Sequence, residues 1–218
     1  MREKLMKKIG EQKIVAIVRG VSSRHIVEVG KALLAGGVSM VEVTFDHAGS
    51  DGIVETLASL SLLKSELGGE LSFGAGTVLT EGEVVEAHKR GAEYIISPNV
   101  DAAVIAKTKE LGMLSMPGAF TPTEIVSAHR MGADIVKIFP AVIGGVDYVK
   151  AVRGPLAHIP MAAVGGVEPG NVADFLKAGI FCFGIGSNLV NAKKVAAGDF
   201  ASITETAKAF NQRLGALN

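Results

Sequence analysis

Short apolar runs recur along the chain, and amphipathic stretches fill the gaps between them. Nearly continuous apolar runs are typical of parallel strands that are covered on both faces, and amphipathic stretches are typical of surface helices. The pattern predicts eight strands, at residues 13 to 19, 40 to 45, 71 to 77, 93 to 97, 113 to 117, 134 to 139, 160 to 164 and 181 to 186. Residues 1 to 12 form one more amphipathic stretch, which predicts a helix that closes the bottom of the fold.

Glycines mark the ends of the helical stretches. Gly36, Gly91, Gly112, Gly132 and Gly179 each follow an amphipathic stretch and precede an apolar run. Glycine is common at the C-terminal end of a helix because it adopts a positive φ without steric cost. The stops at Gly91, Gly112 and Gly132 lie 21 and 20 residues apart, which indicates a repeating strand-helix unit.

Eight such units in 218 residues predict an α/β fold, a (β/α)₈ TIM barrel with an extra N-terminal helix. A doubly wound open sheet is the alternative, because it shares the alternation of strands and helices. Neither a linker nor a low-complexity segment interrupts the chain, so we expect a single domain over residues 1 to 218.

Composition narrows the classes of function. The chain has 22 basic and 22 acidic residues and no run of like charges, which argues against nucleic acid or a membrane surface as a partner. Residues 1 to 8 lack the apolar core of a signal peptide, and no apolar segment reaches the ~20 residues of a membrane span, so we expect a cytoplasmic protein. Cys182 is the only cysteine, which excludes an intrachain disulfide and a thiolate metal cluster. The five histidines show no metal-ligand spacing, so we expect neither a metal nor another cofactor.

One charged residue interrupts the sixth predicted strand. Lys137 shares its face with Ile135 and Phe139, and a strand of a parallel sheet is covered on both faces, so we expect the ammonium to be buried. Burial lowers the pKa of a lysine from about 10.4 toward neutrality, and the neutral amine is the nucleophile that attacks a carbonyl. A structural ion pair at the barrel mouth is the alternative interpretation.

Two more charged residues occupy predicted strands. Glu42 lies inside the apolar run at residues 40 to 45, where its carboxylate can pair with Lys137 and shuttle protons during the chemistry of a carbonyl adduct. Simple neutralisation of Lys137 is the alternative role for Glu42. Arg19 ends the first strand, where a guanidinium can bind a carboxylate or phosphate through two parallel hydrogen bonds; a solvated arginine is the alternative.

Glycine-rich turns end three of the predicted strands. Gly74-Ala75-Gly76-Thr77 lacks the third glycine and the downstream acid of a dinucleotide fingerprint, so we interpret it as room for the backbone plus a hydroxyl. Val164-Gly165-Gly166-Val167 ends the seventh strand, and Gly184-Ile185-Gly186-Ser187-Asn188 ends the eighth and opens a short helical stretch through Asn191. Backbone N–H groups at these two places predict a phosphate site, with ligand-free tight turns as the alternative.

Several segments, taken together, resemble the 2-keto-3-deoxy-6-phosphogluconate (KDPG) and 4-hydroxy-2-oxoglutarate (KHG) aldolase family over residues 13 to 213. They are Glu42-Val43-Thr44, Gly74-Ala75-Gly76-Thr77-Val78-Leu79, Ile96-Ser97-Pro98, Met116-Pro117-Gly118, Lys137-Ile138-Phe139-Pro140-Ala141, Gly165-Gly166-Val167 and Gly186-Ser187.

The resemblance implies a class I aldolase, a lyase in which Lys137 forms a Schiff base with pyruvate and Glu42 transfers protons. It further implies that Thr77, Pro98 and Phe139 line the pyruvate pocket. Gly165, Gly166, Gly186 and Ser187 would then hold the phosphate of a small phosphorylated 2-oxo acid. A homotrimer that needs no cofactor or metal is also implied.

Two residues depart from the pattern of this family and bear on the substrate. Asp46 stands where many members carry an arginine, and Val164 stands where many carry a threonine. A valine before the paired glycines looks more like the related 2-keto-3-deoxy-6-phosphogalactonate (KDPGal) branch, whose substrate differs in configuration at C4. Arg19 would then supply the positive charge that Asp46 does not.

Two other classes of function share some of these features. A phosphate-binding barrel isomerase or epimerase would use the glycine loops without a buried lysine on strand six. A sugar-phosphate binding module would use the same loops without any chemistry.

Overall fold

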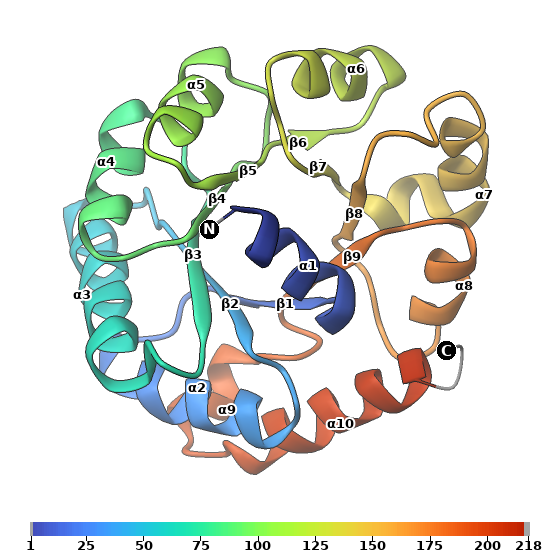
Figure 1. Cartoon of the computed structure of the whole chain (residues 1–218). Coiled ribbons are helices and arrows are strands. Elements are labelled where there is room, and N and C mark those ends of the chain that lie inside the picture. Colours follow the sequence, from blue (N-terminus) through green and yellow to red (C-terminus); the bar gives the residue numbers. More distant parts are fainter. Residues whose placement is uncertain (1, 216–218) are drawn as a thin grey trace.

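The computed structural model describes residues 2 to 215, and these form a ring of strands surrounded by helices (Figure 1). The strands are β1 Ile14–Val18, β2 Met40–Thr44, β3 Ser72–Gly76, β4 Tyr94–Ile96, β5 Leu114–Met116, β6 Gly118–Ala119, β7 Val136–Ile138, β8 Met161–Val164 and β9 Cys182–Ile185. The helices are α1 Arg2–Gln12, α2 Ile26–Ala35, α3 Ser50–Leu67, α4 Glu81–Lys89, α5 Ala102–Glu110, α6 Pro122–Arg130, α7 Ala141–Arg153, α8 Val172–Lys177, α9 Ala192–Ala196 and α10 Ala201–Gly215.

The strands pair in the order β5-β4-β3-β2-β1-β9-β8-β7-β6, and every pair is parallel. The two ends of this order, β5 and β6, are separated in the chain by Pro117 alone. Proline cannot donate a ladder hydrogen bond, but its carbonyl accepts one from the Lys137 N–H at 2.9 Å. On the other side, the Ser97 N–H bonds to the Met116 carbonyl. The segment around Pro117 therefore joins both ends of the sheet, and the (β/α)₈ barrel prediction is confirmed.

The predicted strands all occur, each trimmed by up to two residues at its ends, and a short strand that was not predicted, β6, follows the fifth directly after Pro117. Four of the predicted glycine stops, at Gly91, Gly112, Gly132 and Gly179, have a positive φ between 74° and 99°. Gly36 is the C-cap of α2, as predicted, with a φ of −87°, and the positive φ of 81° comes one residue later, at Gly37.

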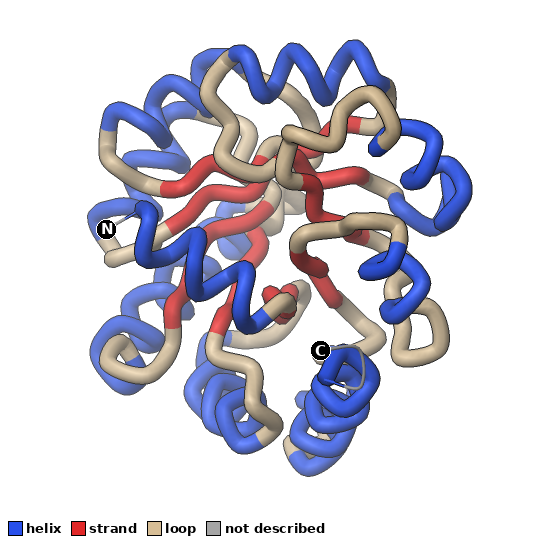
Figure 2. The backbone as a smooth tube through the Cα atoms, turned by 45° about the vertical axis from the view of Figure 1, so that its right-hand side comes forward, coloured by secondary structure: helices blue, strands red, loops and turns tan. Residues whose placement is uncertain are grey.

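The core has two parts. One lies between the strands and the surrounding helices, and the other fills the inside of the barrel with side chains that include Tyr94, Met40 and Cys182. Helix α1 lies across one end of the barrel (Figures 1 and 2), where it adds Leu5 and Ile9 to the inner part. The predicted closing helix is thus confirmed, and Cys182 is buried as a small apolar residue. No helix within residues 2 to 215 combines the length and apolar character needed to cross a membrane.

Candidate active site

A cavity of about 560 Å³ opens at the C-terminal ends of the strands. All the site residues predicted from the sequence line it, although they come from seven different segments: Arg19, Glu42, Thr77, Pro98, Lys137, Phe139, Gly165, Gly166, Gly186 and Ser187. In a parallel barrel the C-terminal ends of all strands meet at one face, which is why residues distant in sequence gather there.

Lys137 lies on β7 with its side chain inside the barrel, and only 6% of the residue is exposed. Its Nζ atom stands 4.5 Å from the centroid of the Phe139 ring. Burial lowers the pKa of Lys137; the carboxylate of Glu42 opposes this shift, and the cation of Arg19 adds to it. Within residues 2 to 215, no carboxylate lies within 4.0 Å of the ammonium. Lys137 is therefore not held in a close ion pair, and its surroundings favour the neutral amine.

Glu42 lies on β2 and is 1% exposed. Burial raises the pKa of Glu42, while Lys137 and Arg19 act in the opposite direction. Its Oε2 atom has no hydrogen-bond partner among the described residues, so this oxygen is open to a proton-bearing ligand. The site thus combines a buried amine with a buried carboxyl whose pKa values are displaced toward each other, an arrangement suited to proton transfer near neutral pH.

Gly74-Ala75-Gly76-Thr77 lies in β3 and at its end, not in a turn, and it provides the room that the sequence predicted. A Cβ atom at Gly76 would lie 1.7 Å from Glu42 Oε1, and one at Gly74 would lie 2.2 Å from the ring of Tyr94. Either methyl group would collide with a buried side chain. The glycine at position 76 is therefore what allows the carboxyl of Glu42 to lie against the neighbouring strand.

Arg19 and Thr77 meet across the mouth of the cavity. The Arg19 Nη2 donates a hydrogen bond of 2.9 Å to the Thr77 hydroxyl, which joins the segments that follow β1 and β3. Thr77 has a φ of 55°, an uncommon value for a residue with a branched side chain. The guanidinium retains further donors, so the pair forms a cationic corner that suits a carboxylate.

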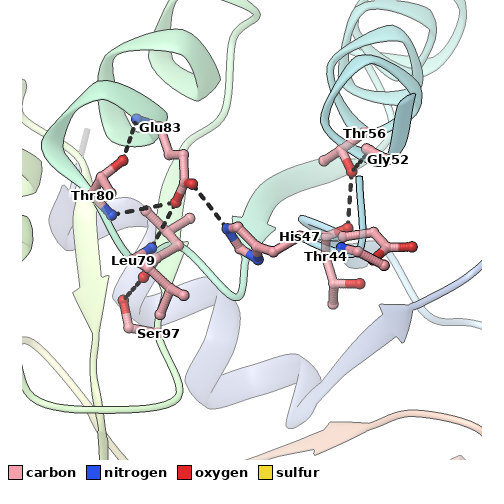
Figure 3. A network of polar contacts seen from close by, with 11 residues as sticks. Thr44, His47, Gly52, Thr56, Leu79, Thr80, Glu83 and Ser97 are labelled. Carbon is pink, nitrogen blue, oxygen red and sulfur yellow. Dashed lines mark hydrogen bonds and ion pairs between the residues drawn. The ribbon is translucent and has the colours of Figure 1, made fainter. Parts of the chain in front are cut away.

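A polar network secures the loops beside this corner (Figure 3). The carboxylate of Glu83 accepts hydrogen bonds from the Leu79 and Thr80 N–H groups and lies 2.9 Å from His47 Nε2. The Thr56 hydroxyl donates to the Thr44 carbonyl at the end of β2. The loops that follow β2 and β3 are thereby tied to each other and to the ends of their helices.

The two glycine loops follow β8 and β9, and β9 pairs with β1, the strand that precedes Arg19. Gly165 and Gly166 have φ values of 91° and 78°, which residues with a Cβ rarely adopt. The N–H groups of Gly165, Gly166, Gly186 and Ser187 have no acceptor in residues 2 to 215. Free backbone donors on two facing loops form a surface that suits a phosphate or another anion.

The predicted helical stretch through Asn191 is wrong. Residues 186 to 190 form a turn, closed by hydrogen bonds from the Leu189 and Val190 N–H groups to the Gly186 carbonyl. Helix α9 begins only at Ala192, and the side chain of Asn191 caps its Lys193 and Lys194 N–H groups. The first amides of α9 are therefore occupied, and the anion surface belongs to the turn.

The two departures from the family pattern lie in different surroundings. Val164, 6% exposed, lines the cavity next to the glycine loop. Asp46 is exposed and does not line it, and its Oδ1 accepts a hydrogen bond from the Ala48 N–H. Val164 can therefore contact a ligand directly, whereas Asp46 shapes its own loop.

Three lining residues were not expected from the sequence to line the site: Ile17, Val190 and Ala192. All three are apolar, and an apolar residue at the end of a strand cannot be distinguished from a core residue by its pattern. Ile17 had one signal, since it lies two residues before Arg19 on the same face of β1 and pairs in register with Glu42. In the described part of the chain, no group of three or more His, Cys, Asp or Glu side chains could hold a metal ion.

The sequence and the structure of this chain both match known aldolases. The family model described as KDPG and KHG aldolase matches residues 5–206. A probable 2-dehydro-3-deoxy-6-phosphogalactonate aldolase of Rhizobium meliloti (strain 1021) is 37% identical over 180 residues, covering 82% of each protein. The KHG/KDPG aldolase of Escherichia coli (strain K12) is 32% identical over 197 residues, covering 89% of each. The crystal structure of KDPG aldolase from Legionella pneumophila, with pyruvate captured as a covalent carbinolamine, superposes with a TM-score of 0.84 at 25% identity, covering 94% of this chain and 97% of the other.

The lowered pKa of Lys137 can be tested by acetylation. Acetic anhydride reacts only with neutral amines, so the rate for Lys137, corrected for hydrolysis of the reagent, should level off at a pH below the ordinary lysine pKa of about 10.4. Peptide mass spectrometry after short exposures across a pH series gives this profile independently of how accessible the amine is. Exposed Lys31 serves as the internal control. A Lys137 profile that coincides with that of Lys31 would contradict the effect of burial.

Proposed function

The chain belongs to the KDPG and KHG aldolase family of aldehyde-lyases, and from that premise we propose that it cleaves a phosphorylated 2-oxo acid to pyruvate and an aldehyde through a Schiff base on Lys137. The observation that carries this proposal is the buried amine of Lys137, free of a close carboxylate, in the same cavity as the buried carboxyl of Glu42. The principal substrate is KDPG, with KHG as the phosphate-free substrate of the same chemistry.

The reaction begins with attack of neutral Lys137 on the C2 ketone, which gives a carbinolamine. Loss of water from this adduct forms an iminium ion, and its positive nitrogen accepts the electron pair of the breaking C3–C4 bond. Glu42 takes the proton of the C4 hydroxyl as the aldehyde leaves. The enamine that remains is protonated at C3, and water then hydrolyses the iminium to release pyruvate and the free amine. The aldehyde is glyceraldehyde 3-phosphate from KDPG or glyoxylate from KHG.

The displaced pKa values of the two groups fit their roles. Lys137 must be neutral to attack, and burial favours that form. Glu42 must both accept and donate a proton, and a carboxyl whose pKa is raised by burial does so closer to neutral pH. No metal is needed, because the iminium itself withdraws the electrons.

Two groups of residues in the cavity supply the remaining contacts. The corner formed by Arg19 and Thr77 suits the substrate carboxylate, with Pro98 and Phe139 as the apolar walls around the three carbons of pyruvate. The free N–H groups of Gly165, Gly166, Gly186 and Ser187 suit the phosphate. An isomerase or a binding module would use these loops equally, but neither requires a buried lysine beside a buried glutamate.

A second candidate substrate is KDPGal, and Val164 is the residue that favours it. Val164 lines the cavity before the glycine loop, so it offers a methyl group where a threonine would offer a hydroxyl. A site without that donor loses a hydrogen bond to a hydroxyl in one of the two C4 configurations. The relative from Rhizobium meliloti is named as a probable 2-dehydro-3-deoxy-6-phosphogalactonate aldolase.

Trapping with borohydride tests the Schiff base. Reduction in the presence of pyruvate should leave a stable adduct on Lys137, located by peptide mass spectrometry, and Lys137→Met should abolish both the adduct and turnover. Glu42→Gln should still form the adduct but turn over about 100-fold more slowly or worse, because proton transfer is lost. An adduct on another lysine, or inactivation by a chelator, would refute the mechanism.

The role of Val164 is tested by Val164→Thr with KDPG and KDPGal assayed side by side. The change keeps the shape of the side chain and adds a hydroxyl, so it should move the ratio of kcat/KM values toward KDPG by about tenfold, the value of one hydrogen bond. An unchanged ratio would mean that another part of the cavity discriminates between the two configurations at C4.

We also propose a homotrimer, supported by the family resemblance and by the exposed apolar side chains of Val142 and Ile143 at the start of α7. Light scattering coupled to size exclusion should then give three times the chain mass of 22.5 kDa. A monomer mass would refute it. The cytoplasmic location expected from the sequence stays a prediction.

A further inference from the structure

Asn188 is the residue by which the two glycine loops are joined. It lies in the turn of residues 186 to 190, and its Nδ2 donates a hydrogen bond of 2.9 Å to the carbonyl of Val167 in the other loop. It also lines the cavity. Among the described residues, its Oδ1 atom has no hydrogen-bond partner.

The loop after β8 is held at three successive carbonyl groups. The Gly165 carbonyl accepts from the Val142 N–H at the start of α7, and the Gly166 carbonyl accepts from Asn171 Nδ2. The third bond is that from Asn188 to Val167. Because the N–H of a peptide unit points away from its C=O, fixing these oxygens also fixes the directions of the N–H groups. The free N–H of Gly166 is thereby aimed before any ligand arrives.

Only one of these three bonds reaches the second loop. Val142 and Asn171 lie next to the loop that they hold, in α7 and at the start of α8, whereas Asn188 follows β9. The turn that contains Asn188 does not itself need this side chain, since it is closed by the Leu189 and Val190 N–H groups on the Gly186 carbonyl. The side chain of Asn188 therefore connects the two loops, and its own turn keeps its shape without it.

We propose that Asn188 is a positioning residue that makes this site selective for phosphorylated substrates, by joining the two glycine loops so that their free N–H groups meet one phosphate together. This inference rests on the proposed function, since it assigns the phosphate of the substrate to those loops. The Asn188 side chain bonds to the glycine loop after β8, so its effect belongs to the binding of the phosphate and not to the Schiff base.

The experiment compares Asn188→Ala with Asn188→Asp. Alanine removes the bond to Val167, and we expect the KM for KDPG or KDPGal to rise about fivefold to tenfold, the value of one hydrogen bond, with kcat within about twofold. Aspartate keeps the size of the side chain but cannot donate to the Val167 carbonyl, and it adds a negative charge beside the phosphate. We therefore expect kcat/KM for the phosphorylated substrate to fall by about 100-fold in Asn188→Asp, because like charges repel at short range.

A phosphate-free ligand separates this role from a general structural one. Pyruvate carries no phosphate, so the pyruvate concentration that gives half-maximal borohydride trapping on Lys137 should stay within about twofold of wild type in both variants. The matched control is Asn191→Asp, which adds the same charge three residues away. Aspartate can still accept from the Lys193 and Lys194 N–H groups, so this control should keep the wild-type KM.

Two results would overturn the inference. The first is an unchanged KM for the phosphorylated substrate in both Asn188 variants, and the second is an equal loss of pyruvate trapping. Failure of the proposed function looks different, because wild-type protein would then give no pyruvate adduct on Lys137 at all.

Discussion

The burial of one amine and one carboxyl at the same end of the barrel is the constraint on which the site depends. Lys137 and Glu42 are both almost fully enclosed, and desolvation is the largest influence on the pKa of each. Water would stabilise both charged forms, so the site functions only if the barrel keeps water away from these groups. The packed barrel interior beneath them, closed at its far end by α1, provides that exclusion.

Closure of the barrel places Lys137 where this constraint can act. The backbone N–H of Lys137 bonds to the carbonyl of Pro117, the residue between β5 and β6, which pair with different neighbours. A Cβ atom at the following Gly118 would lie 2.3 Å from the Pro98 carbonyl oxygen, so the strand can come this close to the end of β4 only because glycine stands there. Gly76 provides the same kind of room for Glu42 on the other side. Small residues in the strands thus decide where the large functional side chains fit.

The cavity divides its work between two groups of residues. A cationic corner is formed by Arg19 and Thr77 after β1 and β3, and two loops rich in free N–H groups follow β8 and β9. Glu42 comes from β2, between β1 and β3, and Lys137 comes from β7, next to β8. A substrate with a carboxylate at one end and a phosphate at the other would be held at both ends, with its carbonyl brought to the amine. Such two-point binding converts binding energy into correct orientation at the reacting carbon.

The sequence by itself determined the alternation of strands and helices, the barrel and the identity of the polar groups in the cavity. The spacing of apolar residues predicts the strands and helices. The polar groups stand out because a charged residue such as Lys137 in an apolar parallel strand has few structural explanations. The family resemblance added Pro98 and Phe139, which no local pattern distinguishes. Tertiary structure alone decided the break between β5 and β6 at Pro117, the absence of a close ion pair at Lys137 and the contact of Asn188 with Val167. The positive φ at Gly37 and the turn before Asn191 also became visible only in the structure. The first three depend on distances between segments far apart in the chain, and such distances are set by packing, which the order of polar and apolar residues does not encode.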